Sequence, residues 1–129
     1  MAKKNIATFL APSKGLSIAG SHAYAYSGSF ASAGGGSADT TYLSFTSGNY
    51  YLVGTLHIYE KTSGSHERFS TVTFNGVNVI EIKGDGNPDW LNNFPMELLI
   101  PPRTVVEIKS GSSDAAPFSA VIVGRIYDA

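Results

Sequence analysis

The sequence predicts an all-β protein, a jelly-roll-like antiparallel β-sandwich of about eight strands. Short runs rich in apolar and β-branched residues alternate with turn residues along most of the chain, and no segment sustains a helical period. An Asn75–Gly76 pair between two such runs indicates a type I′ hairpin. The predicted strands lie at residues 41–46, 50–59, 71–74, 77–82, 96–100, 104–109 and 118–127, with edge strands available from residues 1–19.

Two of these runs carry particular information. In residues 50–59, one face receives Tyr50, Leu52, Leu56 and Ile58, and the other receives Tyr51, Val53, His57 and Tyr59. Gly54 within this run suggests a bulge or a close approach of another backbone. The last run, residues 118–127, is apolar on both faces, so we expect a second sheet or another subunit to cover each face.

Residues 1–40 are predicted to form an extended N-terminal arm followed by a Gly/Ala/Ser-rich segment, and residues 41–129 the sandwich domain. Either apolar piece of the arm can add to a sheet as an edge strand. Residues 20–39 consist mostly of small side chains, which bury too little area to order themselves. We therefore expect their aromatic residues, Tyr24, Tyr26 and Phe30, to be anchors on the domain or on a neighbouring subunit.

The composition disfavours several classes of function. A chain of 129 residues suits one domain. Only 15% of its residues are charged and the net charge is −1, so we expect no binding to nucleic acid or to an anionic membrane. The absence of cysteine removes disulfides and thiolate chemistry. The apolar patch at residues 6–11 is too short for a signal peptide, which predicts a soluble chain that is not exported.

No motif dictates a reaction. Asp85, Asn87 and Asp89 imitate the start of a calcium loop, but Trp90 and Met96 replace the glycine and the glutamate that should follow. The three histidines are scattered, so we predict no metal and no cofactor. An acid/base pair of His57 and Glu60 stays open, although no activated nucleophile accompanies it. We therefore predict that the chain is not an enzyme.

Trp90 is the basis of an alternative binding function. Flanked by Asp89 and followed closely by Asn92, this tryptophan suits stacking on a sugar ring while its neighbours bind the hydroxyls. A carbohydrate-binding or receptor-recognition module that uses residues 85–93 is therefore the alternative prediction. The favoured interpretation is that Trp90 plugs the end of the sandwich or docks on a neighbouring subunit.

The C-terminal third carries a family resemblance. The pattern LLIPPRTVVEIK, a loop of small residues and then FSAVIVGRIYDA resembles small jelly-roll proteins of tailed-phage virions, the capsid decoration or cement class and related head-fibre and spike domains. The likeness covers residues 42–127 and has no catalytic residues to transfer. Tumour-necrosis-factor-like and complement-type trimers have a similar terminal strand, but this chain is very short and we expect no export signal.

The resemblance implies a structural virion protein made in the host cytoplasm. Such a protein forms a homotrimer that binds the major capsid protein on the outer surface of a phage capsid and stabilises the shell. The last strand can present either Phe118, Ala120 and Ile122 or Val121 and Val123 to another subunit. The predicted oligomer or capsid contacts are Ile6, Phe9, Leu10, Tyr24, Tyr26, Phe30, Phe118, Val121 and Val123.

Overall fold

A computed structural model describes residues 2–9, 15–28, 30–31, 40–60, 67–85, 95–112 and 117–129. Within these residues the chain forms eleven strands and no helix. They are β1 (Ile6–Phe9), β2 (Ser17–Gly20), β3 (His22–Tyr26), β4 (Phe30–Ala31), β5 (Thr40–Thr46), β6 (Tyr50–Glu60), β7 (Glu67–Phe74), β8 (Val77–Asp85), β9 (Met96–Ile100), β10 (Val105–Ser112) and β11 (Pro117–Asp128). The described chain thus offers no helix long and apolar enough to cross a bilayer.

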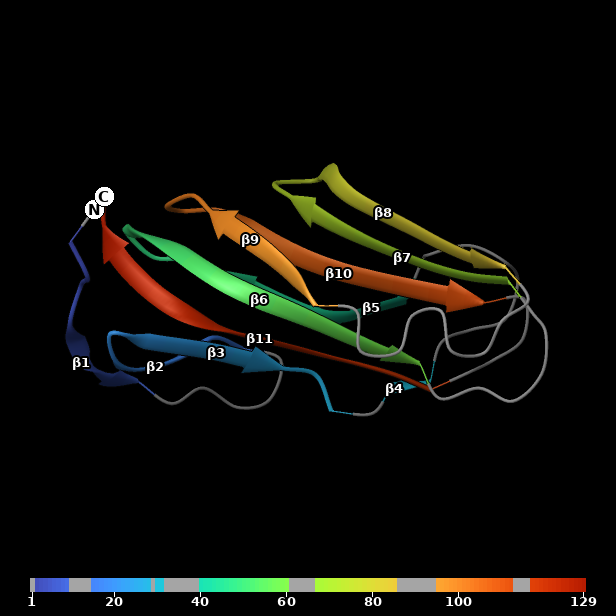
Figure 1. Cartoon of the computed structure of the whole chain (residues 1–129), viewed down its shortest axis with the longest axis horizontal. Coiled ribbons are helices and arrows are strands. Elements are labelled where there is room, and N and C mark those ends of the chain that lie inside the picture. The colour runs from blue at the N-terminus through green and yellow to red at the C-terminus, as the bar shows by residue number, and fades with distance from the viewer. Residues whose placement is uncertain are drawn as a thin grey trace.

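The strands form two antiparallel sheets (Figure 1). The larger sheet has the order β1-β2-β3-β11-β6-β9, and β4 also pairs with β11. The smaller sheet has the order β5-β10-β7-β8. The predicted all-β sandwich is confirmed.

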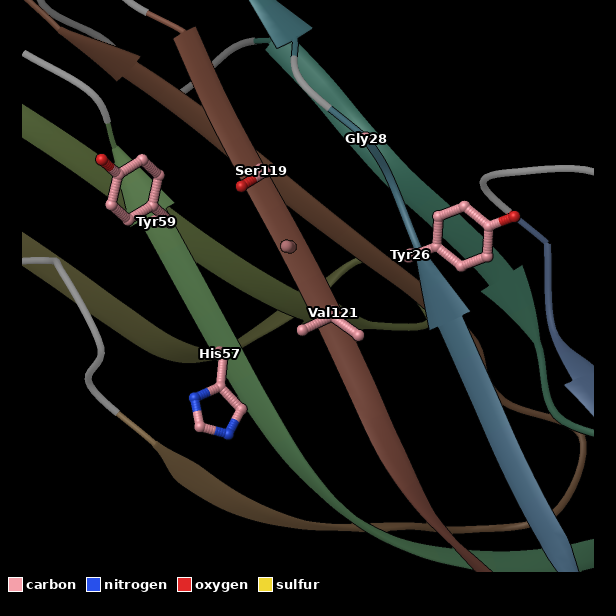
Figure 2. Close-up of a pocket in the computed structure, with 7 residues that line it drawn as sticks. Tyr26, Gly28, His57, Tyr59, Ser119 and Val121 are labelled. Carbon is pink, nitrogen blue, oxygen red and sulfur yellow. The ribbon is translucent and has the colours of Figure 1, made fainter.

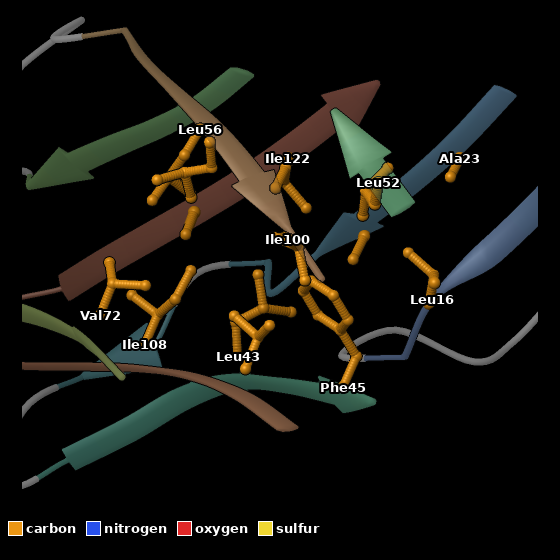
Figure 3. Packing of buried hydrophobic residues seen from close by; sticks show 14 of the residues in the cluster. Leu16, Ala23, Leu43, Phe45, Leu52, Leu56, Val72, Ile100, Ile108 and Ile122 are labelled. Carbon is orange, nitrogen blue, oxygen red and sulfur yellow. The ribbon is translucent and has the colours of Figure 1, made fainter. Parts of the chain in front are cut away.

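Apolar side chains from both sheets pack between them in a single core (Figure 3). From the larger sheet the core receives Leu52, Leu56, Ile58, Leu98, Ile100, Ala120, Ile122 and Ile126. From the smaller sheet it receives Tyr42, Leu43, Phe45, Val72, Val106 and Ile108. Because strand side chains alternate between faces, the face predicted for Tyr50, Leu52, Leu56 and Ile58 is buried as expected.

The β6–β11 pair is the centre of the larger sheet. Its register runs without interruption from Phe118 opposite Glu60 to Asp128 opposite Tyr50. Gly124 lies directly opposite Gly54. A Cβ atom at Gly124 would overlap the Val53 carbonyl oxygen and stand 2.5 Å from the Gly54 Cα. Of the two alternatives for Gly54, the structure therefore has the close backbone approach, and no bulge.

The predicted hairpin is confirmed and also contacts a third strand. Asn75 and Gly76 have φ angles of 51° and 82°, as a type I′ turn requires. The Asn75 backbone N–H donates to the Val105 carbonyl at 2.8 Å, and the Val105 N–H donates to Asn75 Oδ1 at 2.8 Å. The turn between β7 and β8 thereby fixes the start of β10.

The described part of residues 1–40 does not stand apart from the sandwich. β2 and β3 are strands of the larger sheet, and Leu16, Ile18, Ala23 and Ala25 are buried in the core. Ala23 and Ala25 alternate with tyrosines along β3. The inner face of β3 therefore carries only small side chains, which leave room for the second sheet to pack over it. Strand pairing and core packing therefore cross the boundary predicted at residue 40.

The two ends of the chain lie side by side (Figure 1). The Lys4 N–H donates to the Ile126 carbonyl, and the Asp128 N–H donates to the Ala2 carbonyl, each at 2.9 Å. Lys4 Nζ also lies 3.8 Å from Asp128 Oδ1, in an ion pair exposed to solvent. The N-terminal residues thus extend the pairing at the end of β11.

The glycine contact leads to a stability prediction. We expect Gly124→Ala to lower the free energy of unfolding by about 1–3 kcal/mol, because the new methyl group meets rigid backbone atoms. Gly54→Ala is the matched control. Its Cβ would lie 3.1 Å from an Ile122 side-chain atom that can move and 3.2 Å from the Val123 carbonyl oxygen. Both contacts are longer than those at Gly124, so we expect a change within about 1 kcal/mol. Urea titration of both variants measures the difference, and equal effects would contradict this account.

Candidate functional site: the outer face of the larger sheet

The outward side chains of β3, β11, β6 and β9 form one surface, which we call the tyrosine face. The alternation of buried and accessible residues along each strand defines it. Its members are His22, Tyr24, Tyr26, Tyr51, Val53, Thr55, His57, Tyr59, Glu97, Leu99, Ser119, Val121, Val123, Arg125 and Tyr127. Aromatic and aliphatic side chains therefore dominate a sheet face that lies outside the core.

The strand register brings four of the predicted contact residues together on this face. Val121 is opposite Tyr26 in the β11–β3 pair. Val123 is opposite Tyr24 in the same pair. The two tyrosine rings stack with centroids 6.3 Å apart and planes 10° apart. Val123 is 53% exposed and Tyr26 is 46% exposed. These residues form a compact accessible patch on the β3–β11 side of the tyrosine face.

The other predicted site residues are placed differently. Ile6 is half-buried and packs against the core. The backbone of Phe9 pairs with Ile18 in β2, and that of Phe118 pairs with Phe30 in β4. The side chains of Phe9, Phe30 and Phe118, and the whole of Leu10, Asp89, Trp90 and Asn92, lie outside the described residues.

The outer face of the smaller sheet has a different character. Its accessible outward positions carry mainly hydroxyl and charged side chains, namely Ser44, Thr46, Thr71, Glu81, Glu107 and Lys109. The accessible apolar residues of this sheet are Val77, Val79 and Val105, which gather near the β7–β8 turn. The two outer faces of the sandwich thus differ in polarity, and the tyrosine face is the more apolar across its centre.

A local irregularity beside β11 opens a pocket in the tyrosine face. From Tyr26 to Phe30 the chain advances four residues, while its partner β11 advances only three, from Val121 to Phe118. This is the geometry of a β-bulge. Within it, Gly28 adopts a φ of 70°, which glycine accepts without steric cost.

Ser27 holds the edge of the bulge. Its buried Oγ accepts from the Ala120 N–H at 2.9 Å and donates to the Gly28 carbonyl at 2.6 Å. The Ser27 N–H donates to the Ala120 carbonyl at 3.0 Å. The side chain therefore replaces a backbone acceptor where regular pairing of β3 with β11 ends.

The resulting pocket has a volume of about 530 Å³. It is lined by Tyr26, Gly28, His57, Tyr59, Ser119, Ala120 and Val121. Tyr26 and Tyr59 lie on either side of β11, with Ser119 and Val121 between them (Figure 2). The pocket is an open depression with aromatic sides, a shape suited to receive a side chain or ring from another molecule.

The described residues contain no group of three or more His, Cys, Asp or Glu arranged to hold a metal ion. His57 and Ser119 both line the pocket, but they are not opposite each other in the β6–β11 pair. His57 is opposite Val121, and Ser119 is opposite Tyr59.

Burial raises the pKa of the Tyr50 phenol, and a backbone hydrogen bond at Gly48 opposes that rise. Tyr50 belongs to the inner face and takes no part in the pocket. What the tyrosine face offers is contact area with few polar groups.

Sequence reasoning did not select Tyr59, Leu99 or Arg125 as site residues. Their signal was present in part, because the alternation in residues 50–59 already put Tyr59 opposite the core residues. Leu99 and Arg125 become part of one surface only when β9, β6 and β11 are known to be neighbours.

Compared with known proteins, the chain matches no family model, no curated protein and no solved structure. Its function is therefore inferred from its own residues.

The role of Ser27 is testable. We expect Ser27→Ala to lower the free energy of unfolding by about 1–3 kcal/mol, because it leaves the Ala120 N–H buried without its acceptor. Ser119→Ala, at a half-buried hydroxyl on β11, is the control and should change stability by at most about 0.5 kcal/mol. Thermal unfolding of both variants followed by circular dichroism gives the comparison. If Ser27→Ala is as stable as the control, the hydrogen bond between Ala120 and Ser27 does not stabilise the bulge.

Proposed function

We propose that this chain is a structural protein that assembles with copies of itself through the tyrosine face. The observation that carries the proposal is the exposure of tyrosine, valine and leucine side chains from β3 to β9 on the outer face of the larger sheet, while the outer face of the smaller sheet is more polar. Contiguous apolar patches on an isolated chain mark interaction sites. Tyrosine is also enriched in the buried centre of protein interfaces.

The core already uses one of the two sides of β11. Ala120 and Ile122 already pack against the smaller sheet. Val121 and Val123 face the other way and stay accessible. The second of the two alternatives for the last strand is therefore the one available for assembly.

We assign the assembled protein to the class of capsid decoration proteins of tailed phages. In this proposal it is a homotrimer that binds the major capsid protein on the outer surface of the shell and stabilises it. The support is the resemblance of the C-terminal third, together with the strand order. The chain crosses between the sheets from β5 to β6 to β7 and again from β8 to β9 to β10 to β11, an order compatible with the jelly roll that the resemblance implies.

The assembly is tested by placing a charge on the tyrosine face. We expect the wild-type chain to have a solution mass near three times 13.6 kDa in light scattering. Val123→Asp should lower that mass to about 13.6 kDa, because an unpaired carboxylate is costly to bury. Val105→Asp, at an exposed valine of the smaller sheet, is the matched control and should leave the trimer intact. A monomeric wild type at every concentration, or an unaffected Val123→Asp variant, would refute the proposed interface.

Capsid binding requires a separate measurement. We expect the assembled wild type to co-sediment with shells formed by the major capsid protein encoded in the same genome, and to raise their melting temperature. Each assembled particle presents several copies to the shell, so Val123→Asp should bind at least about tenfold more weakly through loss of avidity. If the trimer forms but neither binds nor stabilises the shells, the self-assembly proposal stands and the decoration role is excluded.

A further inference from the structure

Lys3, which pairs with Tyr127, lies beside the tyrosine face, and the strands of the face itself carry two charged residues, Arg125 on β11 and Glu97 on β9. Both are exposed in the isolated chain. Among the described residues, the ion pair present joins Lys4 to Asp128, and neither Arg125 nor Glu97 takes part in it. If this face is covered by another molecule, both charges lose their water. A buried charge is tolerated when an opposite charge or strong hydrogen bonds compensate it.

The two charges do not pair with each other within one chain. β6 lies between β11 and β9. Arg125 is opposite Val53, whereas Glu97 is opposite Thr55. Their Cα atoms are therefore two strand spacings apart across the sheet and two residues apart along it, which is about 12 Å. Both side chains would have to extend fully toward each other across β6 to meet, and among the described residues no ion pair joins them.

The immediate neighbours of each charge do not supply a partner. Arg125 lies opposite His22 on β3 and Val53 on β6, and Val123 and Tyr127 flank it on the same face of β11. Glu97 lies on the edge strand β9, opposite Thr55 and beside Leu99. His57 is its diagonal neighbour on β6, and among the described residues no ion pair joins the two. Burial under an apolar surface would leave one cation and one anion uncompensated, at a cost that exceeds the gain from the surrounding side chains.

We propose that Arg125 of one copy pairs with Glu97 of a neighbouring copy when the tyrosine faces assemble. This inference rests on the self-assembly proposed above and names the pair that fixes its register. Cations lie on the β11 side of the face, Arg125 with Lys3 beside Tyr127, and the anion Glu97 lies on the far side of β6, so the face is complementary to a second copy of itself. Guanidinium and carboxylate groups also form bidentate hydrogen bonds, which set orientation as well as affinity.

Charge reversal tests the pair. We expect Arg125→Glu and Glu97→Arg each to raise the dissociation constant of the assembly at least about 30-fold, since each variant opposes two like charges in the contact. The double variant restores opposite charges in reversed order. Its dissociation constant should return to within about fivefold of the wild type. Sedimentation across a concentration series measures all four proteins, and circular dichroism verifies that each is folded.

Two control variants make the same charge changes on the outer face of the smaller sheet. Lys109→Glu matches Arg125→Glu on an inner strand, and Glu81→Arg matches Glu97→Arg on an edge strand. Both controls should assemble like the wild type. If they weaken assembly as much as the test variants do, net charge and not a specific pair controls association, and the proposed pair is wrong.

The remaining outcomes separate the two proposals. If the wild type assembles but the double variant stays as impaired as the single variants, the pair is wrong and self-assembly stands. If the wild type is monomeric throughout, both proposals fail.

An equimolar mixture of the two single variants also tests whether the assembly contains three copies. A ring of three always retains one contact between like charges, so full recovery of the mixture would support the pair and overturn the trimer.

Discussion

The pairing of β6 with β11 is the interaction on which the rest of the structure depends. These long strands run together without a break in register, and the Gly54–Gly124 contact lets their backbones approach closely at the centre. β3 joins one side of the pair and β9 joins the other. Because side chains alternate along a strand, this register determines which residues enter the core and which lie on the opposite face.

The two faces of that pair have separate roles. The inner face closes the sandwich with the smaller sheet and uses ordinary aliphatic packing. The outer face receives tyrosines and valines that an isolated chain leaves accessible, and the bulge at Ser27 and Gly28 adds a depression with aromatic sides. Arg125 and Glu97 introduce two charges on this otherwise weakly polar surface. Apolar contacts supply affinity in such an interface, while a charged pair fixes which arrangement of copies is accepted.

The sequence predicted where strands lie along the chain better than it predicted which strands pair with each other. The alternation in residues 50–59 and the Asn75–Gly76 turn depend on local side chains, and the structure agrees with both. Residues 20–31 were harder, because alanine and serine suggest a loop by composition. In the structure Ala23 and Ala25 face the core, and Tyr24 and Tyr26 face outward. The candidate site depends on β3 lying beside β11, a long-range register that no local pattern contains.

The central claim is that a second copy covers the tyrosine face, and hydroxyl-radical footprinting of the wild-type chain tests it most directly. Labelling at a dilute and at a concentrated condition compares accessible side chains in the same protein. We expect Tyr26, Tyr59 and Leu99 to become protected as concentration rises, while Val77 and Val79 on β8 stay equally reactive. Unchanged labelling of the tyrosine face in a sample that has assembled would place the contact elsewhere and contradict the account.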